Sequence, residues 1–451
     1  MTTIAPSKYA PEIKTALPGP KSKAIIDVDS KYVSQSYTRT YPTVIERGEG
    51  SYLFDVDGNC YVDFHSGIAV CSTGNAHPDV VNAVKRQAER SLHIATADFY
   101  HDLVAPLAKK LAELAPGNNP KRVFFTNSGT ESTEAALKLA RYKTKRPRFL
   151  AFIDAFHGRT MGSVSLTCSK KVQRQGFSPM LEVTHVPYAN CYRCPYHLEY
   201  PSCEMHCVKV IDDVYLDRVA PAEDVAAIFV EPCQGEGGYI VPPKEFHPML
   251  SAIAKKHGIL YVDDEVQWGM GKTGKMWAIE HFDCTPDIIS TAKAIASGLP
   301  LGAIIADADL MDWPPGSHST TFGGNPVACA AAIETIRLLE DGMIANAKTM
   351  GDYFKDRLLA MQEVHPSMGD VRGLGLLLAV EFVLDRKTKE PAVDMANEIM
   401  DQCFRRGLML LTCGKSGIRL VPPLVVDKTT ADQGLDIFEA VIGELEKKYL
   451  K

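Results

Sequence analysis

The sequence predicts an α/β fold in which a large domain with a mostly parallel central sheet is joined to a smaller α+β domain built from both chain termini. From Lys121 to about Asp307, short apolar runs alternate with stretches of helical periodicity, which is typical of parallel strands covered by helices on both faces. The chain has 451 residues, whereas single hydrophobic cores stop growing near roughly 250 to 300 residues. The length therefore favours more than one domain.

Three segments make up the predicted domains. Residues 1–70 form an N-terminal segment of the small domain, residues 71–335 form the large domain, and residues 336–451 complete the small domain. A cysteine-rich insertion at residues 188–212 interrupts the large domain. Near the N-terminus we expect a two-stranded ribbon, because apolar and polar residues alternate on both sides of Asp57-Gly58, a dipeptide typical of tight hairpin turns.

Six apolar runs are the expected strands of the large domain, and helical stretches lie between several of them. The strand candidates are Val123–Thr126, Phe149–Ile153, Ala226–Glu231, Ile259–Asp263, Ile288–Thr291 and Leu301–Ala306, and the helix candidates are Glu134–Lys145 and Lys244–Lys256. In parallel sheets, ligands bind beyond the carboxyl ends of the strands. Polar residues at those ends are therefore candidate site residues.

The composition excludes several classes of protein. Lys plus Arg number 49 and Asp plus Glu 55, a net charge of −6, so the clustered positive charge of a nucleic-acid or anionic-membrane surface is not expected. No apolar run approaches the roughly 18 residues of a membrane span. The first 23 residues contain no apolar signal core. We therefore expect a cytoplasmic globular protein.

The first chemical signal follows the strand candidate that ends at Thr126. Ser128, Gly129 and Thr130 lead into an Ala-rich helix, and Glu131 lies three residues after Ser128. Exposed amides and hydroxyls at a helix N-terminus can bind a phosphate group. The same residues would also form an ordinary helix with a capping box, and the sequence alone favours neither interpretation.

Two strand candidates end in carboxylates, and a third is followed by an isolated lysine. Glu231 and Asp264 lie at the predicted ligand edge, where a half-buried carboxylate is costly unless it meets a cation. Lys293 precedes a stretch without charged residues from Ala294 to Ile305. A desolvated lysine can act as a Schiff-base nucleophile. Each residue alone could be a cap or a surface residue, but a phosphate cradle, an acid and a shielded lysine together describe a pyridoxal 5'-phosphate (PLP) site.

Six ordered motifs resemble those of the class III, fold-type I PLP-dependent aminotransferases, the group of the 4-aminobutyrate, ornithine and acetylornithine enzymes. The similarity spans roughly residues 35 to 445. The motifs are Asn127-Ser-Gly-Thr-Glu, Phe156-His-Gly-Arg-Thr, Glu231-Pro-Cys-Gln-Gly-Glu-Gly-Gly, Asp263-Asp-Glu-Val-Gln, Ala292-Lys-Ala-Ile-Ala and Thr321-Phe-Gly-Gly-Asn-Pro.

The resemblance implies a role for each matched residue. Lys293 would form the Schiff base and move the substrate proton, and Asp264 would hold the proton of the pyridinium nitrogen. The other implied cofactor contacts are phosphate binding by Ser128, Gly129 and Thr130, stacking by Phe156, a ring-hydroxyl contact from Gln267, and phosphate binding by Thr321 from the second subunit of a homodimer.

The resemblance also implies substrate contacts. Arg419 would grip the α-carboxylate of the keto acid, and Glu236 would pair with that arginine when an ω-amine occupies the pocket. Arg159 would hold a distal carboxylate, although a structural ion pair is an alternative role. Ile68 stands where ornithine-type enzymes carry a tyrosine, and Glu231 completes the substrate group.

These residues lead us to expect ping-pong transamination from an ω-amino acid of the 4-aminobutyrate type to 2-oxoglutarate. Two alternatives share the scaffold: a broad-specificity amino-acid racemase or epimerase, and an ornithine- or acetylornithine-type aminotransferase. Cofactor motifs do not separate them, because racemisation uses the same lysine. A binding protein without catalytic activity is disfavoured by the intact Lys293 and Asp264.

The insertion carries four cysteines within seventeen residues, Cys191, Cys194, Cys203 and Cys207. Thiolates at C-x2-C spacing can share one metal ion, which suggests a structural zinc or iron–sulfur site. Disulfides and free thiols are alternatives that the sequence leaves open.

Overall fold

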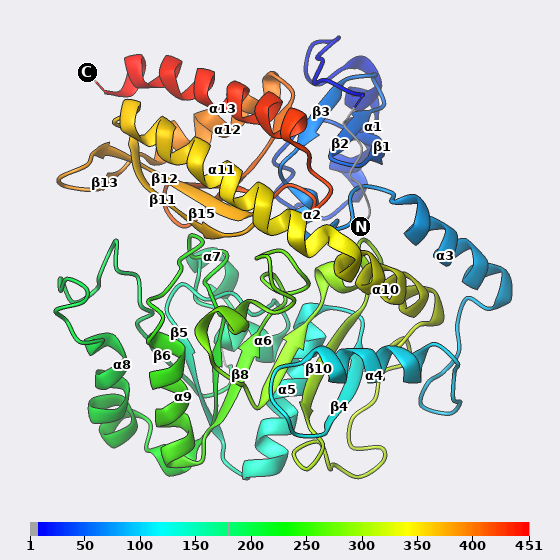
Figure 1. Ribbon diagram of the computed structural model, residues 1–451, viewed down its shortest axis with the longest axis vertical. Coiled ribbons are helices and arrows are strands. Elements are labelled where there is room, and N and C mark those ends of the chain that lie inside the picture. Colours follow the sequence, from blue (N-terminus) through cyan, green and yellow to red (C-terminus); the bar gives the residue numbers. More distant parts are fainter. Residues whose placement is uncertain (1–7, 178–179, 451) are drawn as a thin grey trace. The chain divides into compact units, whose positions relative to one another are not determined.

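The computed structural model describes residues 8–177 and 180–450 (Figure 1). The described chain divides into two compact units, one formed within Met1–Pro78 and Asp341–Lys451 and the other by Asp79–Glu340. Among the described residues, none of the helices combines the length and the apolar character that crossing a membrane requires.

The unit Asp79–Glu340 is built on a seven-stranded sheet of order β4-β10-β9-β8-β7-β5-β6. Only β10 runs against its neighbours, so the prediction of a mostly parallel sheet in an α/β fold is confirmed. The strands are β4 (Lys121–Thr126), β5 (Arg148–Phe152), β6 (Val183–Val186), β7 (Val225–Val230), β8 (Leu260–Asp264), β9 (Ile288–Thr291) and β10 (Gly302–Asp307).

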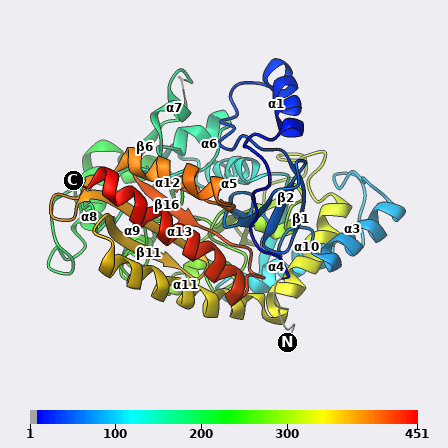
Figure 2. The ribbon, with the colours of Figure 1, turned by 90° about the horizontal axis from the view of Figure 1, so that it is seen from above.

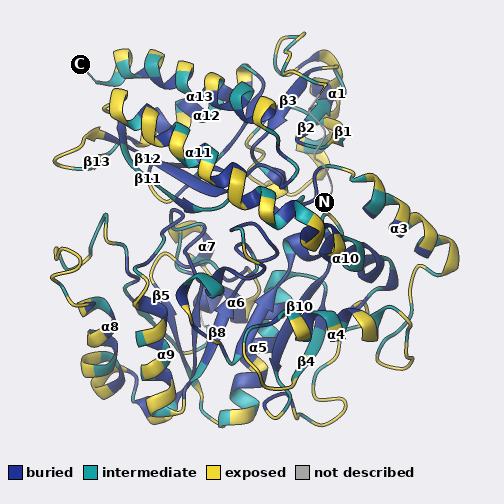
Figure 3. Ribbon diagram, viewed as in Figure 1, coloured by how far each residue is buried: buried dark blue, intermediate teal, exposed yellow. Residues whose placement is uncertain are grey.

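Helices cover both faces of this sheet because its strands are apolar on both sides. Phe149 and Ala151 of β5 pack in one core cluster with the apolar residues of α5 (Gly129–Thr144). Phe152 faces the other side, where its ring centroid lies 5.8 Å from that of Phe246 at the start of α9 (Phe246–His257). The central strands are accordingly buried (Figure 3).

The remaining helices of this unit are shorter or flank the sheet. The helix α10 begins at Pro326, which occupies its first turn, and the Asn325 side chain caps it by accepting hydrogen bonds from Val327 N and Ala328 N. The helices are α3 (Pro78–Arg90), α4 (Val104–Leu114), α6 (Met161–Leu166), α7 (Lys171–Arg174), α8 (His206–Val210), α10 (Pro326–Leu338), the π-helical turn η1 (Ile211–Val219) and the 3₁₀ turns η2 (Ala222–Asp224), η3 (Ala278–Phe282) and η4 (Lys293–Ala296).

The unit formed by both ends of the chain contains two sheets. One has the order β1-β2-β3-β14 and includes the expected ribbon, in which Gly58 takes a φ of 88° between β2 and β3. The other has the order β11-β12-β16-β15, with β13 paired to β12. The strands are β1 (Ile45–Glu49), β2 (Tyr52–Asp55), β3 (Cys60–Asp63), β11 (Met368–Leu374), β12 (Leu377–Asp385), β13 (Glu390–Pro391), β14 (Leu408–Met409), β15 (Leu411–Cys413) and β16 (Gly417–Leu420).

Three long helices pack on the second of these sheets. Figure 2 shows α11 and α13 running side by side, and α12 packs against both α13 and the strands. The helices of this unit are α1 (Pro20–Tyr32), α2 (Ser66–Ala69), the π-helical turn η5 (Leu339–Met343) at its boundary, α11 (Ile344–Val364), α12 (Val393–Arg405) and α13 (Lys428–Tyr449).

Candidate active site

A cavity of about 280 Å³ lies at the carboxyl ends of the parallel strands of the large unit. Five strands deliver residues to it, because β4, β5, β7, β8 and β9 all end at this edge of the sheet. Its lining residues are Ser128, Gly129, Thr130, Phe156, His157, Gly158, Arg159, Glu231, Asp264, Val266, Gln267 and Lys293. Nine of the residues singled out from the sequence are therefore brought together in one cavity.

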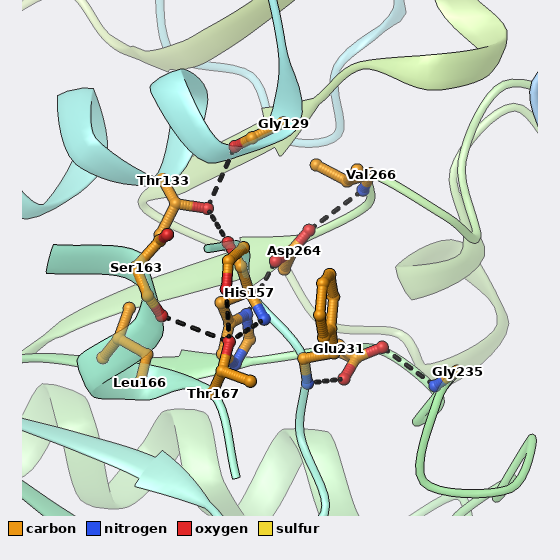
Figure 4. A network of polar contacts seen from close by, with 12 residues as sticks. Gly129, Thr133, His157, Ser163, Leu166, Thr167, Glu231, Gly235, Asp264 and Val266 are labelled. Carbon is orange, nitrogen blue, oxygen red and sulfur yellow. Dashed lines mark hydrogen bonds and ion pairs between the residues drawn. The ribbon is translucent and has the colours of Figure 1, made fainter. Parts of the chain in front are cut away.

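Asp264 is held in a fixed orientation at the end of β8 (Figure 4). Its Oδ2 lies 2.6 Å from His157 Nδ1, and its Oδ1 accepts a hydrogen bond of 3.0 Å from Val266 N. The Asp264 and His157 side chains are both buried. Because each carboxylate oxygen has a partner, the group is oriented before any ligand binds.

The charge of Asp264 acts on its histidine neighbour. Burial lowers the pKa of His157, but the hydrogen bond and the negative charge of Asp264 outweigh burial, so the pKa lies above its ordinary value. The His157 backbone is fixed as well, since its N–H donates to Thr167 Oγ1 at 2.9 Å and its carbonyl accepts from Thr133 Oγ1 at 2.9 Å. The imidazole is thus a stable donor to the carboxylate.

Glu231 is a second buried carboxylate of the cavity. It accepts hydrogen bonds from Phe156 N at 3.0 Å and from Gly235 N at 2.8 Å. Burial and, to a smaller extent, the charge of Asp264 raise the pKa of Glu231 to about 7, although His157 and the two backbone donors oppose the rise. This carboxyl group therefore titrates near neutral pH.

The start of α5 forms one wall of the cavity. The Ser128 hydroxyl caps the helix by accepting from Glu131 N at 3.4 Å, and Thr130 Oγ1 lies 2.6 Å from Ser163 Oγ. At Gly129, a Cβ atom would lie 2.7 Å from Val266 Cγ1, so only glycine allows this close approach of the helix to β8. The capping and the phosphate interpretations are compatible, because a capped N-terminus keeps further N–H groups available.

Lys293 follows β9 with an unusual backbone. Its φ is 47°, a left-handed value that a side chain with a Cβ atom rarely adopts. Ala292 and Ala294 on either side are buried, while Lys293 itself is half-buried. Strained backbone of this kind concentrates at functional sites, and here it accompanies a lysine that lines the same cavity as Asp264.

Two further lining residues, Gln267 and Arg159, each contact an aromatic side chain. Gln267 is buried and its Oε1 accepts a hydrogen bond of 2.9 Å from the Tyr239 hydroxyl. Arg159 is exposed, and its guanidinium carbon lies 5.6 Å from the centre of the Phe156 ring.

Four of the residues expected at the site do not line this cavity. Thr321 is exposed on the same unit. Glu236 lies in the turn after β7, where its Oε2 is 3.6 Å from Lys170 Nζ. Ile68 and Arg419 belong to the other unit: Ile68 is 43% exposed and Arg419 is buried on β16.

The sequence analysis did not assign roles to His157, Gly158 or Val266, although all three line the cavity. All three lie within motifs quoted for the resemblance, so a signal was present. What the sequence could not reveal is the pairing of His157 with Asp264, which are 107 residues apart.

The prediction of a zinc or iron–sulfur site in the insertion is not supported. Among residues 8–177 and 180–450, no three His, Cys, Asp or Glu side chains are grouped so that they could hold a metal ion. The disulfide alternative is not seen either, because the four cysteines carry free thiols. They line a cavity of about 20 Å³ instead. Sequence spacing alone did not orient the sulfur atoms toward a common point.

The residues of the larger cavity fit PLP. The N-terminus of α5 presents backbone and hydroxyl donors for a phosphate, and Asp264 is an oriented acceptor for a ring nitrogen. Phe156 supplies an aromatic face, and Lys293 supplies the primary amine that an aldehyde requires.

Comparison with known proteins agrees with this chemistry. The family model described as aminotransferase class-III matches residues 32–442. A leucine/methionine racemase of Thermococcus litoralis is 38% identical, with 95% of this chain and 97% of that protein covered. A probable 4-aminobutyrate aminotransferase of Bacillus subtilis is also 38% identical, with coverage of 91% and 95%. A solved Bacillus anthracis aminotransferase superposes with a TM-score of 0.87 at 29% identity, covering 94% of this chain and 99% of that one.

Proposed function

Because the chain belongs to the class III aminotransferase family, whose members use PLP, we propose that it moves an amino group from an ω-amino acid of the 4-aminobutyrate type to 2-oxoglutarate. The reaction is a ping-pong exchange, in which the donor leaves as its deaminated product before the acceptor binds. The observation that carries the proposal is the convergence of Lys293, Asp264 and the N-terminus of α5 on one cavity.

Bound PLP supplies an electron sink for the negative charge that develops when a substrate carbon loses its proton. Ser128, Gly129 and Thr130 would hold its phosphate, and Asp264 would hold the proton of its ring nitrogen, with His157 keeping that carboxylate oriented. Phe156 and Gln267 would contact the ring and its hydroxyl, as the family resemblance implies.

Lys293 is the residue that acts on the substrate. Its amine would bind the cofactor aldehyde and, when free, would take the proton from the α- or ω-carbon of the substrate. The backbone that carries this amine is left-handed at Lys293 and lies between two buried alanines. A lysine whose backbone is held in this way is suited to moving a proton between two positions in the cavity.

The substrate assignment rests on four further residues. Arg159 lies beside Phe156 in the cavity wall and suits a distal carboxylate. Arg419 is assigned to the α-carboxylate, Glu236 to the switch between the two substrates, and Ile68 to the apolar contact of a 4-aminobutyrate-type donor, all by family resemblance.

A homodimer is part of the proposal, with Thr321 completing the phosphate site of the partner subunit. Thr321 and its neighbour Phe322 are both exposed, and Phe322 is in ring contact with His93 at 5.1 Å. Large exposed apolar residues mark association surfaces. Leu92, whose carbonyl accepts a hydrogen bond from Asn325 Nδ2, is exposed as well, and so are Phe99 and Tyr100 further along the same segment.

We place the protein in the cytoplasm.

The experiment is a two-arm assay of the purified enzyme with PLP. Incubation with 4-aminobutyrate and 2-oxoglutarate should produce glutamate, and the Lys293→Ala variant should produce none above background. Borohydride treatment should fix PLP on Lys293, detected by peptide mass spectrometry. Absence of both glutamate and the modified peptide would contradict the proposal.

The second candidate is a racemase or epimerase. It is favoured by the T. litoralis racemase and by an isoleucine 2-epimerase of Lentilactobacillus buchneri that is likewise 38% identical. The second arm of the assay incubates L-leucine or L-isoleucine without a keto acid and separates the products on a chiral column. Accumulation of the epimerised product together with no glutamate in the first arm would favour this candidate. An ornithine- or acetylornithine-type donor is tested by exchanging the donor in the first arm.

A further inference from the structure

Lys170 places a positive charge beside Glu236, the acidic residue of the turn after β7. Its Nζ lies 3.6 Å from Glu236 Oε2, and the Lys170 side chain is 42% exposed whereas that of Glu236 is 15% exposed. The lysine was not among the residues that the sequence analysis singled out.

Local structure holds Lys170 where it is. It is the residue before α7, and the Gln173 side chain of that helix accepts from Lys170 N at 3.1 Å and from Ser169 Oγ at 2.7 Å. The preceding segment is tied to the cavity wall, since Cys168 N donates to Ala155 O at 2.7 Å. The ammonium therefore extends from an anchored backbone.

The turn that carries Glu236 is anchored to the same wall. Gln234 Nε2 donates to Ile153 O at 2.7 Å, and Gly235 N donates to Glu231. At Gly237, a Cβ atom would lie 2.6 Å from Asp154 O, so the turn lies directly against the segment that leads to Phe156. Glu236 and Lys170 thus form a charge pair on two anchored segments next to the cavity.

A glutamate near this cavity opposes the binding of an acceptor that carries two carboxylates, because like charges repel across a partly desolvated site. We propose that Lys170 is a specificity-determining residue, whose ammonium offsets the charge of Glu236 and so lets the site accept a dicarboxylate keto acid. This inference rests on the proposed function. Lys170 contacts no reacting atom in this account and acts through Glu236.

The test compares Lys170→Ala with Lys171→Ala in the PLP-loaded enzyme. Lys171 is the adjacent exposed lysine, so its removal changes the net charge equally. In Lys170→Ala, the KM for 2-oxoglutarate should rise roughly threefold to fivefold, the size expected for a half-exposed charge pair. The kcat and the KM of the amine donor should stay within about twofold. Lys171→Ala should leave all of these constants unchanged, and Lys170→Arg should restore the KM.

A second readout does not depend on turnover. Glutarate, an unreactive five-carbon dicarboxylate, should inhibit the Lys170→Ala enzyme more weakly by the same factor. In a Glu236→Gln background, Lys170→Ala should no longer weaken glutarate inhibition, because no glutamate charge remains to be offset.

The two proposals fail in different ways. A wild-type enzyme that forms no glutamate contradicts the proposed function. A wild-type enzyme that is active, with Lys170→Ala indistinguishable from Lys171→Ala in both KM and glutarate inhibition, overturns the role of Lys170. An equal rise in KM for Lys170→Ala with and without Glu236 would also overturn it.

Discussion

Two cavities of the large unit were both expected from sequence motifs, and they differ in how their polar groups are held. In the cavity at the strand ends, Asp264 and Glu231 each accept two hydrogen bonds from fixed partners. In the cavity of the insertion, four cysteines face a space of about 20 Å³ without forming a metal-holding group among the described residues. The difference shows that spacing in sequence supplies the ligands, whereas the surrounding backbone supplies their orientation.

The pKa values of the polar groups also differ between the two cavities. Asp264 has a buried histidine whose pKa is raised by the pairing. The thiols of the insertion have no such partner: burial and the neighbouring thiols raise the pKa of Cys191, and they raise that of Cys207 to about 12. These raised pKa values favour the protonated form of Cys191 and Cys207, the form that binds metal poorly.

The largest effect is expected from removing the charge of Asp264, which tests whether the oriented carboxylate of the strand-end cavity is used. Asp264→Asn should lower kcat by roughly two to four orders of magnitude, because the acceptor for the ring-nitrogen proton is lost. His157→Gln should cause a smaller loss, since it leaves the carboxylate in place. Steady-state kinetics would measure kcat of both variants, and an unchanged circular dichroism spectrum would show that each variant is folded. Activity within tenfold of wild type in Asp264→Asn would show that the oriented carboxylate is not used.

Glu231 gives a pH test of intermediate size. Its pKa rises from an ordinary 4.5 to about 7 in the folded protein, so between these values the folded state binds a proton that the unfolded chain releases. Stability supplied by this group is present below about pH 4.5 and is lost as the pH rises through 7. A pKa difference of this size corresponds to about 3 kcal/mol in the free energy of unfolding.

We therefore expect the advantage of wild type over Glu231→Gln to shrink by up to about 3 kcal/mol between pH 4.5 and 8. Urea unfolding of both proteins across that range measures it. Glu199→Gln, which alters an exposed glutamate, is the control and should follow wild type at every pH. Parallel curves for Glu231→Gln and wild type would mean that this carboxyl group is not held protonated by its surroundings.

The smallest effect is expected in the insertion. Replacing the exposed Cys191 with serine should change the unfolding free energy by no more than about 0.5 kcal/mol and leave kcat unchanged. Prolonged treatment with EDTA should leave the thermal midpoint where it was. A drop in that midpoint after chelation, reversed by added zinc and absent in Cys191→Ser, would show that the thiols do hold a metal ion.

Much of the fold could be predicted because apolar runs mark strands directly. The six predicted strands of the large domain match β4, β5, β7, β8, β9 and β10 within a few residues. The seventh, β6, was missed because it has only four residues, two of them Thr184 and His185, and pairs with a single neighbour. A short edge strand needs no continuous apolar run.

The site was predictable to the extent that its residues follow strands. Glu231, Asp264 and Lys293 end or follow consecutive strands of the sheet, so the topology brings them together. The partners of the site carboxylates come from distant segments: His157 orients Asp264, and Lys170 lies beside Glu236. No local sequence pattern indicates such pairs. Their roles in catalysis stay predictions until the variants are measured.

The one reversed strand, β10, has a consequence for the lysine. Because β10 is antiparallel to β9, the chain returns to the adjacent position in the sheet without a helical crossover, and Ala303 pairs with Thr291. Residues 292–301 are therefore a short bridge whose two ends are fastened to neighbouring strands. Such a bridge has little conformational entropy left to lose. Lys293 lies on this segment, which is held at both ends. We therefore expect its amine to return to the same place after every turnover.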